Sequence, residues 1–255
     1  MERKKRRPKT STSKKAETLS FPIRLNKYIA NAGICSRRDA DALISEGKIK
    51  INDKVVTELG RKVEKGDKVK HNGKLIVLQK FAYVLLNKPK AFLTTMDDPQ
   101  GRPTVMKLVE GSCDERIFPV GRLDRNTTGL LLFSNDGELS QKLTHPKYKI
   151  KKIYQVELNK ALTSNDANQI ADGVKLEDGL VNVDEIVILD ESKKNIGIQI
   201  HVGKNRIVRR IFESLGYEVT KLDRTMYGNL TKKNLPRGKW RLLTEKEVVL
   251  LKNLS

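Results

Sequence analysis

Several residue types that build common functional sites are scarce in this sequence, which has two cysteines and three histidines among 255 residues. Cys35 and Cys113 are too few and too far apart to suggest a disulfide framework or a zinc site, and the histidines show no metal-ligand spacing. No stretch approaches the roughly 18 apolar residues of a membrane-spanning helix. The basic N-terminus lacks the apolar segment of a secretory signal. We therefore expect a cytoplasmic protein with neither a metal site nor a membrane anchor.

Positive charge is abundant, since 51 Lys and Arg face 31 Asp and Glu and leave a net charge of +20. Residues 1–19 hold eight Lys/Arg against two Glu, and residues 21–80 hold fourteen against seven Asp/Glu. The first third of the chain thus carries most of the excess. This distribution favours nucleic acid as the partner over an anionic membrane surface, for which the chain has no apolar anchor.

The chain is long enough for one large and one small domain. Residues 1–20 are basic and rich in Ser and Thr, so we expect a disordered arm. Such an arm either contacts RNA phosphates or serves only solubility. We assign residues 21–70 to a small domain, 71–80 to a linker and 81–255 to a second domain.

The small domain has the pattern of two helices and a hairpin. Residues 24–30 place apolar side chains at i and i+3 or i+4, as a helix does. Ser36 is the predicted N-cap of a second helix that ends at Gly47. An alternating strand at residues 48–52 then leads into a turn.

Residues 24–28 (RLNKY), Gly33 and residues 36–38 (SRR) resemble the small RNA-binding domain first known from a ribosomal protein of the small subunit. The resemblance implies that this unit binds RNA. Its candidate RNA-binding residues are Arg24, Lys27, Arg37, Arg38 and Lys48.

The second domain mixes strands and helices irregularly. Strands are expected at residues 83–86, 130–133, 153–158, 186–189 and 196–202, and helices at residues 163–170, 206–215 and 248–254. This mixture predicts an α+β fold with a mixed, largely antiparallel sheet.

A charged loop precedes the apolar run at residues 130–133. In it, Asp124 lies between Arg122 and Arg125. A glycine-bounded loop before a buried strand can present a polar group at the edge of a cleft. The alternative is a surface turn in which Asp124 bonds its own backbone. Residues 135–137 (NDG) after the run predict a second turn.

The gapless run at residues 121–137 resembles the catalytic signature of the pseudouridine synthases that modify ribosomal RNA, in the branch with an N-terminal RNA-binding module. The resemblance covers about residues 22–250 and implies that Asp124 is catalytic. Pseudouridine formation breaks the N-glycosidic bond, turns the base and joins its C5 to C1′. One ionised carboxylate suffices for this chemistry, without a metal or redox cofactor. Asp124 either attacks C1′ as a nucleophile or assists proton removal at C2′.

Two further segments resemble family motifs with active-site roles. Tyr154, in residues 152–154 (KIY), matches a tyrosine that packs against the target base, although an ordinary strand aromatic is the alternative. Arg209, in residues 203–210 (GKNRIVRR), matches an arginine that pairs with the catalytic Asp. The alternative for Arg209 is a basic helix N-terminus.

The same resemblance extends to residues 87–90 (NKPK), which are followed by Ala91 where the family usually has Gly. In the segment around Arg209, Ile207 replaces a residue that is usually polar. Lys204 likewise replaces the family's usual Arg. The candidate RNA-binding residues of this domain are Lys88, Arg122, Lys204 and Arg206.

Residues 98–105 (DPQGRPTV) are most similar to members that act on large-subunit RNA. We therefore predict a monomeric enzyme that isomerises a uridine of large-subunit ribosomal RNA, as free RNA or within a pre-ribosomal particle. The alternatives are the same enzyme acting on small-subunit RNA and a non-catalytic RNA-binding or ribosome-assembly protein. A metal-dependent nuclease, suggested by Asp97 and Asp98, is disfavoured because two adjacent carboxylates lack the wider set of ligands that a two-metal site needs.

Overall fold

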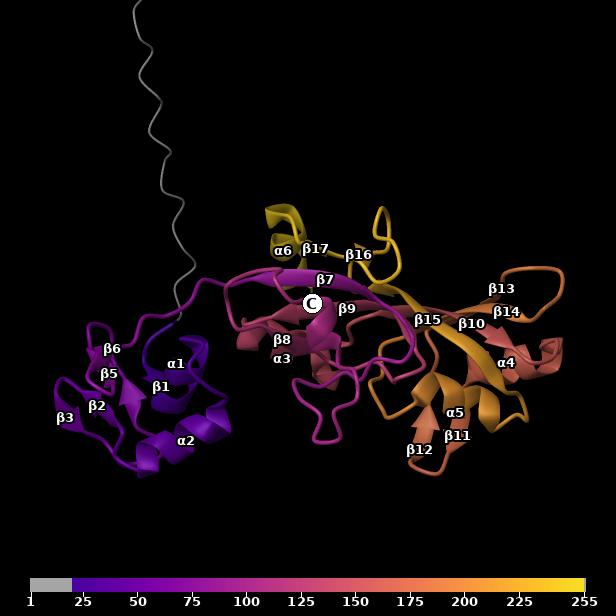
Figure 1. The fold of residues 1–255 in the computed structure, drawn as a ribbon. Coiled ribbons are helices and arrows are strands. Elements are labelled where there is room, and N and C mark those ends of the chain that lie inside the picture. Colours follow the sequence, from indigo (N-terminus) through magenta and orange to yellow (C-terminus); the bar gives the residue numbers. More distant parts are fainter. Residues whose placement is uncertain (1–19, 255) are drawn as a thin grey trace, which may run out of the picture. The chain divides into compact units, whose positions relative to one another are not determined.

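The computed structural model describes residues 20–254, which form two compact units divided between Lys80 and Phe81 (Figure 1). Residues 1–19, where the basic arm was predicted, lie outside the described residues. Within the described part, no helix is long and apolar enough to cross a membrane.

The first unit has two helices and two small antiparallel sheets. The helices are α1 (Leu25–Asn31) and α2 (Arg37–Ser45). The four-stranded sheet has the order β3-β2-β5-β6, and β1 pairs with β4. The strands are β1 (Ile23–Arg24), β2 (Ile49–Ile51), β3 (Lys54–Val55), β4 (Lys62–Val63), β5 (Val69–His71) and β6 (Lys74–Leu75).

Local sequence signals explain much of this unit. The Ser36 hydroxyl accepts a hydrogen bond from the Asp39 amide, and the Asp39 carboxylate accepts one from the Ser36 amide, which forms the capping box of α2. Asn52 and Asp53 both have positive φ angles, as a tight turn between β2 and β3 requires. The apolar faces of both helices pack into one core with the buried Ile49.

The structure corrects the linker predicted at residues 71–80. β6 lies within that range and pairs with β5. Asn72 and Gly73 form the turn between these strands with positive φ angles, a hairpin signal that the linker assignment overlooked. Ile76 is buried in the first unit's core and its amide donates to the Val69 carbonyl oxygen at 2.8 Å. The first unit therefore extends at least to Ile76.

The second unit is built on a nine-stranded sheet with the main order β13-β14-β10-β15-β9-β7-β17. All of its pairs are antiparallel except β15 with β9, so the predicted α+β fold with a mixed, largely antiparallel sheet is confirmed. Its strands are β7 (Tyr83–Lys88), β8 (Phe118–Val120), β9 (Thr128–Ser134), β10 (Lys152–Leu158), β13 (Glu185–Ile188), β14 (Asn195–Ile200), β15 (Val219–Tyr227), β16 (Leu230–Thr231) and β17 (Trp240–Leu242).

Helices and a separate hairpin accompany this sheet. The α-helices are α3 (Gly137–Thr144), α4 (Ser164–Asp172), α5 (Ile207–Glu213) and α6 (Glu245–Lys252), and the 3₁₀-helices are η1 (Val105–Leu108) and η2 (Pro146–Tyr148). The hairpin consists of β11 (Val174–Leu176) and β12 (Gly179–Val181).

Both faces of the central strands are buried. Leu131 and Phe133 of β9 join one apolar cluster, to which α4 and α5 contribute, whereas Leu130 and Leu132 join a second cluster with α3 and α6. Successive side chains of a strand point to opposite faces. This explains why β9 is a continuous apolar run rather than an alternating one.

Residues 135–137, where a turn was predicted after β9, lead through a bend at Asn135 into α3. Asp136 is the N-cap of α3, because its carboxylate accepts a hydrogen bond from the Leu139 amide at 3.0 Å. The same residue types that favour turns also favour helix N-caps, so the local signal was ambiguous.

Candidate active site

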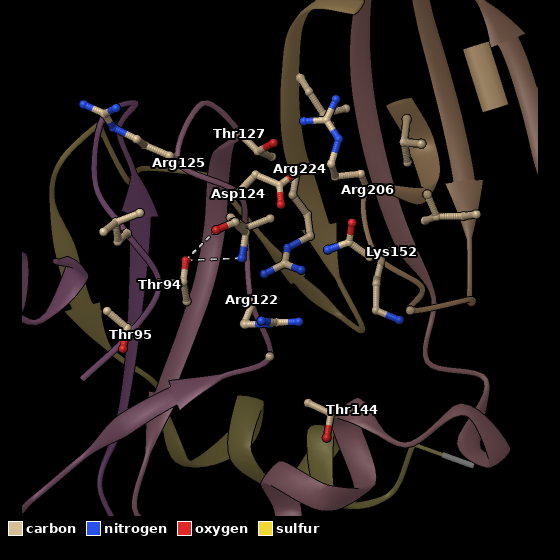
Figure 2. A pocket seen from close by; sticks show the side chains of 18 of the residues that line it. Thr94, Thr95, Arg122, Asp124, Arg125, Thr127, Thr144, Lys152, Arg206 and Arg224 are labelled. Carbon is tan, nitrogen blue, oxygen red and sulfur yellow. Dashed lines mark hydrogen bonds between the residues drawn. The ribbon is translucent and has the colours of Figure 1, made fainter. Parts of the chain in front are cut away.

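The second unit contains a cavity of about 680 Å³ with Asp124 in its wall (Figure 2). The loop before β9, the start of β10, the segment before α5 and the middle of β15 all contribute to it. Its charged lining residues are predominantly basic, with Asp97, Asp98 and Asp124 against Arg102, Arg122, Arg125, Lys152, Lys204, Arg206 and Arg224. The excess of basic residues makes the cavity suited to an anionic ligand.

The Asp124 loop is shaped by backbone and hydroxyl contacts. Thr94 Oγ1 donates to the Leu123 carbonyl oxygen at 2.6 Å, and the Leu123 amide donates back to Thr94 Oγ1 at 3.3 Å. The Thr127 amide donates to the Asp124 carbonyl oxygen at 3.1 Å. Within the described residues, the Asp124 carboxylate itself has no hydrogen-bond or ion-pair partner, which leaves it available to a substrate. The predicted position of Asp124 in a cleft rather than a plain surface turn agrees with this geometry.

Lys88 lies beneath this loop and is completely buried, with 0% of its surface exposed. Its Nζ donates to the carbonyl oxygens of Asp124, Arg125 and Thr127 at 3.1, 3.3 and 2.9 Å, and to that of Pro89 at 3.2 Å. Burial lowers the pKa of Lys88 to about 8, against the attraction of Asp124. The prediction that Lys88 binds RNA is wrong, because the ammonium group is enclosed by the loop that it supports.

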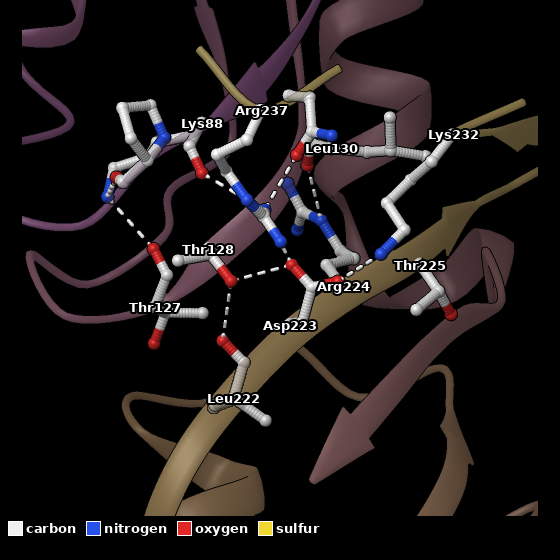
Figure 3. A network of polar contacts seen from close by, with 12 residues as sticks. Lys88, Thr127, Thr128, Leu130, Leu222, Asp223, Arg224, Thr225, Lys232 and Arg237 are labelled. Carbon is white, nitrogen blue, oxygen red and sulfur yellow. Dashed lines mark hydrogen bonds and ion pairs between the residues drawn. The ribbon is translucent and has the colours of Figure 1, made fainter. Parts of the chain in front are cut away.

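A second polar network supports the strand pair behind the loop (Figure 3). Asp223 of β15 accepts hydrogen bonds from Thr128 Oγ1 at 2.6 Å and Arg237 Nη1 at 2.7 Å, and it forms an ion pair with Lys232. Burial alone would raise the pKa of Asp223, but these contacts together lower it. The network ties β15 to the first residue of β9 and so to the end of the Asp124 loop.

Gly129 is required where β9 and β15 run parallel. A Cβ atom at this position would lie 2.2 Å from the Arg224 carbonyl oxygen, and Gly129 has a φ angle of 105°. Only glycine tolerates both the contact and the backbone conformation. The glycine five residues after Asp124 is thus explained by the close approach of the two strands.

Tyr154 of β10 lines the cavity with 8% of its surface exposed. It lies opposite Arg224 of β15 in the sheet. The structure therefore brings Tyr154 and Asp124 to the same cavity, and a stacking role for Tyr154 is compatible with its position.

Arg209 of α5 does not form the predicted ion pair with Asp124. Its Nη1 donates to the Val219 carbonyl oxygen at 2.7 Å, and the residue is not part of the cavity wall. Burial lowers the pKa of Arg209, as does repulsion by Arg206, while attraction by Asp124 opposes this change. The interaction of Arg209 with Asp124 is thus electrostatic without direct contact, because the carbonyl of β15 holds the guanidinium group.

Three other predicted RNA-binding residues, Arg122, Lys204 and Arg206, do line the cavity. Lys204 Nζ also donates to the Asp178 carbonyl oxygen at 2.8 Å, and Arg206 forms an ion pair with Glu213 at 3.0 Å. Figure 2 shows Arg206, Arg224 and Lys152 on the same side of Asp124.

The remaining candidates belong to the first unit. Arg24, Arg37, Arg38 and Lys48 are exposed there, and Lys27 is half-buried. Arg37 and Arg38 occupy the first turn of α2, and Lys48 is paired with Glu46 at 2.5 Å.

Two cavity residues, Lys152 and Arg224, were assigned no role from the sequence, although Lys152 belongs to the segment KIY and Arg224 lies within the range of the resemblance. Lys152 is half-buried and Arg224 is 3% exposed. Their residue types signalled only positive charge, and their burial depends on the pairing of β10 with β15.

No group of three or more His, Cys, Asp or Glu side chains within residues 20–254 could hold a metal ion. Asp98, one of the two carboxylates that suggested a nuclease, is bound by Arg102 through Nη2 at 2.7 Å and Nε at 3.1 Å. Hydrogen bonds from Arg102 lower the pKa of Asp98 to about 2. The geometry thus gives the nuclease hypothesis no support.

Comparisons with known proteins agree with this arrangement. Residues 82–214 match the family model for RNA pseudouridylate synthase, and residues 23–69 match the S4 domain. The chain belongs to the RNA pseudouridylate synthases, which are isomerases that convert uridine to pseudouridine in RNA. The family and enzyme class expected from the sequence are therefore confirmed.

Individual relatives match over most of the chain. A protein of Bacillus subtilis (strain 168) named ribosomal large subunit pseudouridine synthase B is 42% identical, covering 91% of this chain and 96% of that protein. A protein of the same name from Pasteurella multocida (strain Pm70) is 37% identical over 96% of this chain and 75% of its own length. The crystal structure of a pseudouridylate synthase superposes with a TM-score of 0.66 at 29% identity, covering 90% of this chain and 99% of the other.

Proposed function

We propose that this protein isomerises a uridine of large-subunit ribosomal RNA, with Asp124 as the nucleophile. The observation that carries the proposal is the Asp124 carboxylate, which lies in the wall of a basic cavity with Tyr154 and has no partner in the part of the chain that the structure describes. The names of the relatives from B. subtilis and P. multocida support the choice of large-subunit RNA.

The proposed reaction needs no group beyond those of the chain and the RNA. The target nucleotide leaves the base stack and enters the cavity, where its base stacks on Tyr154. The Asp124 carboxylate attacks C1′, and the electrons of the N1–C1′ bond leave with the uracil. The uracil turns, its C5 attacks C1′, and the carboxylate is released. Loss of the C5 proton and gain of a proton at N1, both exchanged with solvent water, then restore the aromatic ring.

The two units have different proposed tasks. The first unit, including Arg24, Lys27, Arg37, Arg38 and Lys48, binds RNA outside the cavity, and its match to the S4 domain supports this task. The second unit, from Phe81, carries the reaction. We further propose that the protein acts as a monomer in the cytoplasm, on free ribosomal RNA or on a pre-ribosomal particle.

Tritium release from ribosomal RNA labelled at uridine C5 tests the proposed function, because joining C5 to the ribose expels that hydrogen. Wild-type protein should release tritium from large-subunit RNA and leave small-subunit RNA unchanged. Release from small-subunit RNA alone would contradict the substrate choice but keep the enzyme class. Failure with both free RNAs and with pre-ribosomal particles would favour a non-catalytic RNA-binding protein.

RNA binding by the first unit predicts a specific effect of salt. Replacing both Arg37 and Arg38 with Gln should weaken RNA affinity and make the slope of log affinity against log salt less negative by about 0.7 for each phosphate that the variant no longer neutralises. Filter binding at several salt concentrations measures this slope. The matched control is Lys54→Gln with Lys65→Gln, which changes the net charge equally at exposed positions of the same unit. An equal change of slope in both double variants would show that net charge alone matters.

A further inference from the structure

Arg224 is a buried cation whose hydrogen-bonding capacity is only partly used. Its Nε donates to the Leu130 carbonyl oxygen at 2.8 Å, and its guanidinium group lies 4.6 Å from the centre of the Tyr227 ring. Among residues 20–254 its buried Nη2 has no partner, although the residue lines the cavity and is only 3% exposed. An unsatisfied donor of a buried charged group is costly, and such a group calls for an explanation.

Lys152 is a second desolvated cation of the same cavity. Its Nζ donates to the carbonyl oxygens of Ile150 and His201, both at 3.1 Å, which uses two of its three protons. Burial, followed by the charge of Arg224, lowers the pKa of Lys152 to about 8, against the attraction of Asp184. In the absence of a ligand, the charges of Lys152 and Arg224 therefore repel each other, and little water is present to screen them.

These two side chains enter the same open space of the cavity, together with Arg122 (Figure 2). A neutral acceptor, such as a uracil carbonyl oxygen, could satisfy Arg224 Nη2 but would leave the repulsion between the two cations. An anion with several acceptor oxygens would satisfy the donors and neutralise the charges together. Phosphate oxygens have this chemistry and are present in every RNA substrate.

We infer that Lys152 and Arg224 form a binding site for the phosphate of the target nucleotide, which places its sugar against Asp124. This inference deepens the proposed function and rests on it. The site is distinct from phosphate contacts at the surface, because its cations are already desolvated before the RNA arrives. A charge-assisted contact of this kind contributes more than an exposed ion pair.

Titration of the full-length protein with uridine, uridine 5′-monophosphate and uridine 3′-monophosphate tests the site without need of catalysis. We expect one monophosphate to bind wild type about tenfold or more tightly than uridine, as a charged hydrogen-bonded contact allows. In Lys152→Gln this preference should shrink to about threefold or less, since one of the two charges is removed. The matched control is Lys151→Gln, at the exposed neighbouring residue, which should keep the preference of wild type.

Arg224→Gln should reduce the preference in the same way, and thermal unfolding shows whether this buried variant folds. If Arg224→Gln does not fold, Lys152→Gln alone decides the test. An undiminished preference in Lys152→Gln, an equal loss in Lys151→Gln, or no preference in wild type would overturn the site. Tritium release is measured separately. If the protein isomerises uridine but shows no Lys152-dependent preference for a monophosphate, only this inference is refuted. A Lys152-dependent preference without isomerisation keeps the anion site and refutes the proposed function.

Discussion

Replacing Asp124 with Asn is expected to abolish pseudouridine formation while RNA affinity stays close to that of wild type. The amide has the shape of the carboxylate but cannot act as the nucleophile, so product formation should fall by more than about 10³-fold. The fold should tolerate the change, because the carboxylate has no partner within the described residues. Single-turnover tritium release and filter binding measure the two quantities on the same RNA.

The matched control for this prediction is Asp97→Asn. Asp97 also lines the cavity and is exposed, so the same loss of charge occurs at a carboxylate with no proposed chemical role. We expect this variant to retain most of the activity. Comparable rates for Asp124→Asn and wild type would refute the role of Asp124 as nucleophile. A parallel loss of RNA binding would show that Asp124 acts through binding instead.

The second large effect is expected for Lys88→Met. Methionine fills a similar volume but donates no hydrogen bonds, so the carbonyl oxygens of the Asp124 loop lose a shared donor. We expect the free energy of unfolding to fall by about 2–4 kcal/mol, the range for buried polar groups left unsatisfied. A loop displaced by about 1 Å should also lower kcat/KM by about 10²-fold. Urea unfolding and tritium release measure the two effects.

Lys90→Met provides the control, because Lys90 is exposed two residues further along the same segment. It should alter stability and kcat/KM little. Wild-type stability and activity in Lys88→Met would contradict the view that Lys88 supports the loop. A stability loss with unchanged kcat/KM would limit its role to folding.

The lowered pKa of Lys88 makes the free energy of unfolding depend on pH. The ordinary lysine pKa of 10.5 applies to the unfolded chain and exceeds the value of about 8 in the folded protein. Between these pH values the unfolded chain binds more protons, so Lys88 makes stability rise with pH. The difference in unfolding free energy between wild type and Lys88→Met should therefore be constant below about pH 8 and increase towards pH 10.5. A flat difference across this window would contradict the lowered pKa.

Local patterns predicted most elements of the fold. The Ser36 capping box, the Asn52–Asp53 turn and the apolar run of β9 are formed by neighbours in the chain, so their residue types were sufficient evidence. The linker was wrongly predicted because the pairing of β6 with β5 was not considered, although Asn72 and Gly73 signal it. The predicted turn at residues 135–137 leads into a helix that its residue types did not distinguish, because turns and helix N-caps favour the same residues.

The candidate site divides in a similar way. Asp124 and Tyr154 could be selected from their motifs, and the structure brings both to one cavity. Lys88 and Arg209 were given the wrong contacts, and Arg224 was given none. All three are cations whose environment is set by distant segments, namely the Asp124 loop for Lys88 and the strands β15 and β9 for Arg209 and Arg224.

The sequence by itself therefore determined the family and the α+β class, and it singled out the carboxylate that we propose as the nucleophile, because these follow from residue order within short segments. The tertiary structure decided which basic residues remain at the surface and which become buried supports or cavity donors. Lys and Arg carry the same charge wherever they occur in the chain. Their function depends on whether water, a backbone carbonyl or another cation surrounds them, and only the packing of distant strands determines that.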